Sequence, residues 1–171
     1  RVMPGMQAAF IDFGEQRTGF LHANDIASSR SLSVASKRQH VADITEVIRQ
    51  GQTVLVQVSK EPLGEKGARL TTRLSLSSRY LVYMPGSGNR GVSQKITDAS
   101  ERERLLNILR GALAGAGADV GSELPELDGL IVRTAADGAE ESQLTADVLF
   151  LSRLWQDVSR RAQASTAPQR V

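Results

Sequence analysis

The apolar residues of this chain repeat with two different spacings, and the change between them falls near residue 75. Before it, short runs rich in β-branched and aromatic residues alternate with glycine-containing turns, a pattern typical of β-strands. After it, apolar residues recur three and four positions apart, which is the spacing of one face of an α-helix. This division predicts an α+β chain with a β-rich domain at 1–74, an α/β part at 75–164 and a frayed tail at 165–171.

The β-rich part predicts a small barrel. Short strands are expected at 8–13, 18–22, 53–58 and 68–74, with a short helix at 43–48 and a basic, serine-rich loop at 28–40. Five short strands joined by tight turns favour an OB fold, the commonest five-stranded barrel, with its first strand cut short at Arg1.

The second part predicts the order strand, helix, strand, helix. Strands are expected at 80–84 and 130–133, separated by a glycine-rich loop at 85–94, a helix that runs to about Leu113, and a flexible connection at 115–121. Asp98 and Glu101 form a capping-box pattern at the start of that helix. The last helix, at 140–162, carries one apolar stripe, composed of Leu144, Val148, Leu151, Trp155, Val158 and Ala162.

Composition excludes several kinds of site. The chain has no cysteine, so disulfides and thiolate metal sites are ruled out, and its only histidines, His22 and His40, lie in different segments. No apolar run approaches the roughly 20 residues of a membrane span. The pattern Gly86-x-Gly88-x-x-Gly91 follows a strand but opens no helix, which argues against a dinucleotide site. We identify no catalytic and no metal-binding residue in the chain.

Charge is divided unevenly between the two parts. Residues 1–97 hold 13 Lys and Arg against 7 Asp and Glu, whereas residues 98–171 hold 8 against 12, although the whole chain has a net charge of only +2. A basic first part indicates a polyanionic partner for that part.

Three phenylalanines in the basic part are candidates for stacking on RNA bases. Since side chains alternate along a strand, Phe10 and Phe13 point to opposite faces of an unbroken strand, and at least one can face outward, as Phe20 can on the next strand. Lys60, Lys66 and Arg69 could follow the phosphates. The alternative, which composition leaves open, is that Phe10 and Phe20 fill the barrel core.

The ordered set of motifs in the chain resembles the bacterial ribonuclease E/G family. Four blocks carry the resemblance, and they extend over most of the chain: 3–12 with 18–26, 66–72, 78–86 with 91–96, and 129–135. The variants Ser78-Arg79-Tyr80 and Met84-Pro85-Gly86 are closer to ribonuclease G than to ribonuclease E. The resemblance implies an S-one-type RNA-binding OB fold followed by part of a ribonuclease-H-like domain, within a cytoplasmic enzyme of RNA processing and decay.

The resemblance also assigns roles to residues. It implies RNA binding by Phe10, Phe13, Phe20, Lys60 and Lys66. It further implies a sensor for a 5′-monophosphate end, formed by Ser78 through its backbone N–H, Val82, Arg133 and Thr134. The implied partner is single-stranded RNA with a 5′-monophosphate.

The resemblance places the catalytic chemistry in another part of the enzyme. It assigns the magnesium-binding aspartates and the zinc-binding cysteines to a later domain of a longer parent enzyme, which it implies is homo-oligomeric. We therefore expect this chain to be a fragment that binds RNA without cutting it. Two alternatives stay open: a non-catalytic RNA-binding adaptor associated with translation, and a structural role in which the helix around Trp155 packs against a partner.

Overall fold

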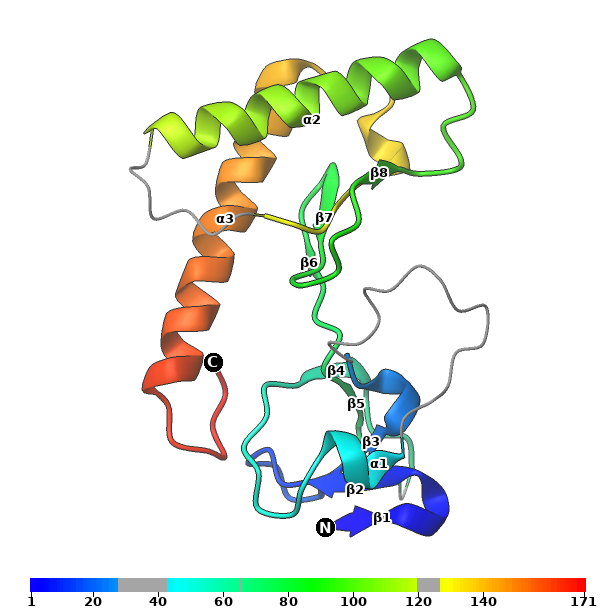
Figure 1. Cartoon of the computed structure of the whole chain (residues 1–171), viewed down its shortest axis with the longest axis vertical. Helices are drawn as coiled ribbons and strands as arrows, with labels where there is room; N and C mark the ends of the chain where they lie inside the picture. Colours follow the sequence, from blue (N-terminus) through cyan, green and yellow to red (C-terminus); the bar gives the residue numbers. More distant parts are fainter. Residues whose placement is uncertain (28–42, 65, 120–126) are drawn as a thin grey trace. The chain divides into compact units, whose positions relative to one another are not determined.

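A computed structural model of the chain describes residues 1–27, 43–64, 66–119 and 127–171 (Figure 1). The chain divides into two compact units, one formed by Arg1–Leu74 with Ala164–Val171 and the other by Ser75–Gln163. Both units combine a sheet with helices, so the chain is α+β as predicted. The loop expected at 28–40 lies outside the described residues.

The first unit is built on a five-stranded sheet. Its strands are β1 (Val2–Met3), β2 (Ala8–Ile11), β3 (Gly19–His22), β4 (Gln57–Lys60) and β5 (Arg69–Thr71). They lie in the order β1-β2-β3-β5-β4, and all pairs are antiparallel except β3 with β5. In the described residues, short helices join them: η1 (Pro4–Met6), η2 (Ala23–Asp25) and α1 (Ile44–Val47). Five strands in a mixed sheet agree with the expected OB fold.

One face of this sheet covers a small core. Ala9 and Leu21 point into it from β2 and β3, Leu70 enters from β5, and Ile44 closes it from α1; all four are buried. Asp43 caps α1, since its side chain accepts a hydrogen bond from the Thr45 N–H at 2.9 Å. Because side chains alternate along a strand, the neighbours of these inward residues on β2 and β3 point to the opposite face.

The second unit is built on a four-stranded sheet. Its strands are β6 (Leu76–Ser77), β7 (Leu81–Tyr83), β8 (Gly91–Val92) and β9 (Leu130–Val132). They lie in the order β6-β7-β9-β8, with β8 and β9 parallel. The helices α2 (Ala99–Asp119) and α3 (Glu141–Ala164) pack against it, and the short helix η4 (Thr134–Ala136) follows β9 (Figure 1).

In the part of this unit that the structure describes, the helices pack against one face of the sheet. Leu81 and Tyr83 of β7 and Val132 of β9 are buried in a core with apolar residues of both helices. The residues between them, Val82 and Ile131, are directly opposite each other on the other face and are half-buried. Since side chains alternate along a strand, Arg133, which directly follows β9, lies on the same open face as Ile131.

Three expected elements differ from the structure. The strand predicted at 53–58 is ordered as β4 only from Gln57, because Val54 and Val56 pack on the core without joining the sheet. The loop predicted at 85–94 contains β8, whose Val92 side chain is buried against the helices. The connection predicted from residue 115 is wrong as far as Asp119, because alanines between the glycines let α2 continue.

The capping box predicted at the start of α2 is confirmed for Asp98 but not for Glu101. Asp98 caps the helix, accepting hydrogen bonds from the backbone N–H groups of Ser100 at 2.7 Å and Glu101 at 3.1 Å. The Glu101 carboxylate does not turn back to Asp98 but accepts from the Gly138 N–H at 2.9 Å and from Arg104. The first turn of α2 thereby holds the loop that follows η4.

Candidate nucleic-acid interface

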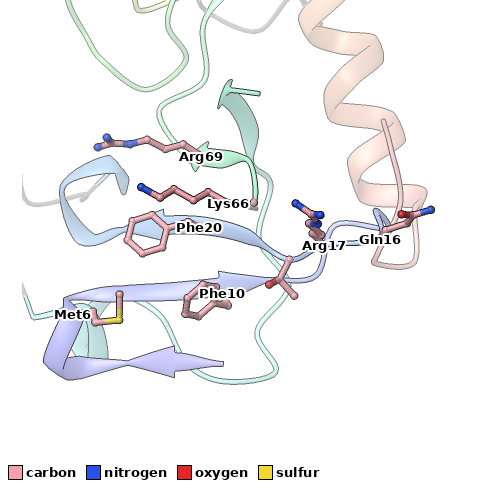
Figure 2. A pocket seen from close by; sticks show the side chains of 9 residues that line it. Met6, Phe10, Gln16, Arg17, Phe20, Lys66 and Arg69 are labelled. Atoms are coloured by element: carbon pink, nitrogen blue, oxygen red, sulfur yellow. The ribbon is translucent and has the colours of Figure 1, made fainter. Parts of the chain in front are cut away.

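Two aromatic rings lie next to each other on the outer face of the first sheet. Phe10 and Phe20 are register partners on β2 and β3, and their ring centroids are 5.9 Å apart in an edge-to-face arrangement. Both rings are half-exposed and line a surface hollow of about 860 Å³ (Figure 2). The alternative in which these two rings fill the barrel core is therefore wrong.

Phe13 lies on the other side of the sheet. It continues the inward alternation of Ala9 and Ile11, and it packs against the core of the first unit. The sequence predicted that Phe10 and Phe13 point to opposite faces, and this is confirmed. A role for Phe13 in contacting RNA stays a prediction, and its packing gives it a structural one.

Cationic side chains border the aromatic hollow. Lys66, Arg69 and Arg17 all line it, and Figure 2 shows them around the two rings. Arg69 pairs with Asp25 at 2.9 Å, and Arg17 donates to the Gly64 carbonyl oxygen at 2.7 Å. Within the described residues, no carboxylate pairs with the Lys66 ammonium group. An apolar floor with a cationic border suits bases and phosphates together.

A close backbone approach gives this hollow its shape. A Cβ atom on Gly67 would collide with the carbonyl oxygen of Thr18, so only glycine lets the segment after Lys66 lie against the start of β3. Lys60, also predicted to bind RNA, is exposed at the end of β4 and is not among the residues that line the hollow.

A second hollow, of about 390 Å³, lies on the second unit where β9 ends. Arg133, Thr134, Ser93 and Lys95 contribute its polar lining. The Arg133 guanidinium donates to the Ser78 carbonyl oxygen at 2.6 Å, and the Arg133 backbone N–H donates to the Tyr80 oxygen at 2.8 Å. In the part of the chain that the structure describes, no carboxylate pairs with this guanidinium. Most of its five N–H donors are thus available to an anion.

The hydroxyl groups of this second hollow come from two segments. Thr134 Oγ1 and Ser93 Oγ lie 3.0 Å apart, and the Ser93 Oγ also accepts from the Lys95 N–H at 3.3 Å. Arg102 of α2 donates to the carbonyl oxygens of Ser93 at 2.8 Å and Ile96 at 2.9 Å, which holds this segment in place. The structure therefore brings two hydroxyls, a guanidinium and a lysine to one place.

The two other predicted sensor residues lie beside this hollow rather than in its lining. Val82 is on the open sheet face, opposite Ile131. The Ser78 backbone N–H, expected to donate to a phosphate, instead donates to the Leu81 carbonyl oxygen at 2.9 Å. Ser78 contributes through its carbonyl, which orients Arg133.

Glu101, in the first turn of α2, has a strongly shifted pKa. The hydrogen bonds from Arg104 and from the Gly138 N–H lower the pKa of the Glu101 carboxyl from 4.5 to about 2. The same pair raises the pKa of Arg104. Glu101 is thus ionised at neutral pH, and it fastens the loop after η4 to α2.

Sequence reasoning missed some of the residues that line the two hollows. Arg17 and Thr18 line the first, and Ser93 and Lys95 line the second, but none of them was assigned a role. A signal existed for the second pair, since both lie within the matched block at 91–96. No periodicity indicated Arg17, because it lies in a turn.

The described residues contain neither a cluster of metal ligands nor a helix that could span a membrane. They contain no group of three or more His, Asp or Glu side chains that could hold a metal ion. None of the helices in the same residues is long and apolar enough to cross a membrane.

Two family models match the chain, one for each part. Residues 1–73 match the S1 RNA binding domain. Residues 75–171 match the ribonuclease E/G family. The boundary between the two matches coincides with the division of the structure into two compact units.

Individual relatives agree with the family models. The chain is 47% identical over 163 residues to ribonuclease G of Escherichia coli K12 and, to the same extent, to ribonuclease G of Haemophilus influenzae. These matches cover 94% of the chain and 31% of each relative, so the chain spans about a third of their length. It is 39% identical to ribonuclease E of a Nostoc species over 170 residues, covering 98% of the chain and 22% of the relative.

Proposed function

Since the chain belongs to the ribonuclease E/G family, we propose that it binds single-stranded RNA and recognises the 5′-monophosphate at its end. In this proposal it is the RNA-holding part of an endoribonuclease that acts in RNA processing and decay. The observation that carries the proposal is the Arg133 guanidinium, which is oriented by a carbonyl oxygen, unpaired with any described carboxylate, and next to the Thr134 and Ser93 hydroxyls.

In this proposal, the aromatic hollow lined by Phe10 and Phe20 binds the RNA strand. Phe10 and Phe20 both line the hollow with their ring planes at 68° to each other, and in this proposal each ring stacks on one base. Lys66 and Arg69 line the same hollow, and in this proposal they bind the phosphates that adjoin a stacked base. Stacking and phosphate contacts carry no base identity, so we expect little sequence preference.

The second hollow supplies recognition of the 5′ end. A terminal phosphate carries about −1.5 to −2 charges near neutral pH, whereas a 5′-hydroxyl carries none. Arg133 can bind two phosphate oxygens through its planar fork, and Thr134 can donate its hydroxyl to a third. Lys95 adds a second positive charge to the lining. Val82 and Ile131 provide an apolar surface beside it, suited to the adjoining nucleotide.

The second unit is, in this proposal, part of a ribonuclease-H-like domain. Its mixed four-stranded sheet with helices on one face supports that assignment. The catalytic magnesium and the linking zinc would be held by other parts of a longer, homo-oligomeric enzyme, and we derive no step through either metal. The chain itself is expected to bind RNA without cleaving it, which incubation of a labelled RNA with the chain and Mg²⁺ would test.

Affinity for two matched RNAs tests the proposal. Wild-type chain is expected to bind a short 5′-monophosphorylated RNA about tenfold more tightly than its 5′-hydroxyl twin, the equivalent of one charge-assisted contact. Arg133→Ala should bind both twins equally. Arg110→Ala is the matched control, because Arg110 is an exposed arginine of α2 that bonds only to Asn107 within the described residues. Equal affinity of wild-type chain for the twins would refute the end recognition.

A further inference from the structure

Asp147 is an acidic residue within the inward face of α3. It lies three residues after Leu144 and four before Leu151, both of which are fully buried, so its side chain points toward the sheet and is half-buried. Within the described residues it has no arginine or lysine partner. Its carboxylate instead accepts two hydrogen bonds from the turn between β6 and β7, from Ser78 Oγ and from the Tyr80 N–H, each at 2.7 Å.

The turn that Asp147 holds is the same turn that orients Arg133. The Ser78 carbonyl oxygen accepts from the Arg133 guanidinium at 2.6 Å, and the Tyr80 carbonyl oxygen accepts from the Arg133 backbone N–H at 2.8 Å. Both residues bound by Asp147 therefore carry the two acceptors that fix Arg133. Asp147 itself is not among the residues that line the hollow.

We propose that Asp147 is a positioning residue, which holds the Ser78–Tyr80 turn so that Arg133 presents its guanidinium to the RNA 5′-phosphate. The inference rests on the proposed function in naming that ligand. Without the carboxylate, the Tyr80 N–H loses its acceptor, and Ser78 Oγ keeps only its longer contacts with the Leu81 backbone, at 3.2 Å. The turn then depends on bonds between Ser78 and Leu81 and has more freedom at Tyr80. Small displacements at a phosphate-binding fork weaken binding strongly, because bidentate contacts depend on geometry.

The two hydrogen bonds of Asp147 allow a positioning role to be distinguished from a direct effect of its charge. Both donors reach the same oxygen, Oδ2, so the amide oxygen of asparagine can accept both bonds without a negative charge. If Asp147 acted through its charge, it would repel a phosphate, and its removal would strengthen binding of the monophosphorylated RNA. A positioning role predicts instead that Asp147→Ala weakens binding of the monophosphorylated RNA and that Asp147→Asn leaves it unchanged.

The experiment compares the monophosphorylated and hydroxyl RNA twins on variants of the whole chain. Asp147→Ala is expected to lower the preference for the monophosphorylated twin about tenfold, with unchanged affinity for the hydroxyl twin, whereas Asp147→Asn keeps the preference. In the Arg133→Ala background, Asp147→Ala should change nothing further. Asp157→Ala controls for the charge, because Asp157 is on the same helix but pairs with Arg160 and Arg161.

A second readout makes the inference independent of the ligand. In ¹H–¹⁵N spectra of the free chain, the Tyr80 and Arg133 amide signals should move and exchange faster with solvent in Asp147→Ala, and return to wild-type values in Asp147→Asn. Unmoved Arg133 signals, or a preference retained by Asp147→Ala, would overturn the positioning role. If wild-type chain does not distinguish the twins, the proposed function fails, and the amide signals alone decide whether Asp147 positions Arg133.

Discussion

Replacing Phe20 by leucine should weaken RNA binding while leaving the first unit folded. The Phe20 ring is half-exposed, has one edge-to-face neighbour in Phe10 at 5.9 Å, and lines the aromatic hollow. It therefore offers one ring face to one base, and a single base stack contributes about 1–3 kcal/mol. Since 1.4 kcal/mol corresponds to a tenfold change, the dissociation constant should rise about 5- to 150-fold.

The cost to stability should be small by comparison. Leucine keeps most of the apolar volume and leaves the buried neighbours Gly19 and Leu21 in place. What it loses are the ring contacts with Phe10 and His22, and an edge-to-face pair such as that with Phe10 contributes about 0.5–1.5 kcal/mol. Phe13→Leu is the matched control, because Phe13 packs on the core and not in the hollow. It should lower the free energy of unfolding, and it should weaken RNA binding less than Phe20→Leu does.

The assay is fluorescence anisotropy with a short labelled RNA that carries a 5′-hydroxyl, so that only the aromatic hollow is tested. Each variant is first checked by circular dichroism and thermal unfolding. The stacking role would be refuted if Phe20→Leu binds as tightly as wild-type chain, or if Phe13→Leu weakens binding as much as Phe20→Leu does.

Three further predictions concern stability and salt. Ser152→Ala should raise the free energy of unfolding by about 1 kcal/mol in chemical denaturation, because the buried Ser152 hydroxyl has no hydrogen-bond partner among the residues that the structure describes; an unchanged value would contradict this. The pKa of Glu101 is lowered from 4.5 to about 2, so its stabilisation is complete above pH 4.5 and disappears as the pH falls toward 2. In Glu101→Gln, the free energy of unfolding should therefore fall less between pH 4.5 and pH 2 than in wild-type chain. The same pH dependence in both proteins would refute the contact. Lys66→Gln should reduce the slope of log affinity against log salt by about one, as measured at several salt concentrations, and an unchanged slope would exclude a phosphate contact.

Local patterns in the sequence were enough to predict the main elements of both units. Leu144, Val148 and Leu151 recur at helical spacing, and all three are buried on one face of α3. Alternation predicted that Phe10 and Phe13 face opposite sides, which the packing of Phe13 confirms. Short strands were predicted less well, since β8 has only two residues and depends on pairing with the distant β9.

The arrangement around Arg133 could not be read from the sequence, because it depends on contacts between distant segments. Ser78 and Arg133 are 55 residues apart, and Asp147 is 69 residues from Ser78. The family resemblance implied that the Ser78 backbone N–H is a phosphate donor, but the turn uses that N–H internally and offers the carbonyl to Arg133. Which end of a peptide group is available is decided by the turn geometry, and no residue type specifies it.

The most direct test of the account is a pair of NMR titrations of wild-type chain with the two RNA twins. Our proposal predicts that both RNAs shift the signals of Phe10 and Phe20, and that only the 5′-monophosphorylated RNA also shifts those of Ser93, Arg133 and Thr134. If the two RNAs shift the same signals, or if the monophosphorylated RNA leaves the Arg133 region unchanged, the chain does not recognise the 5′ end there.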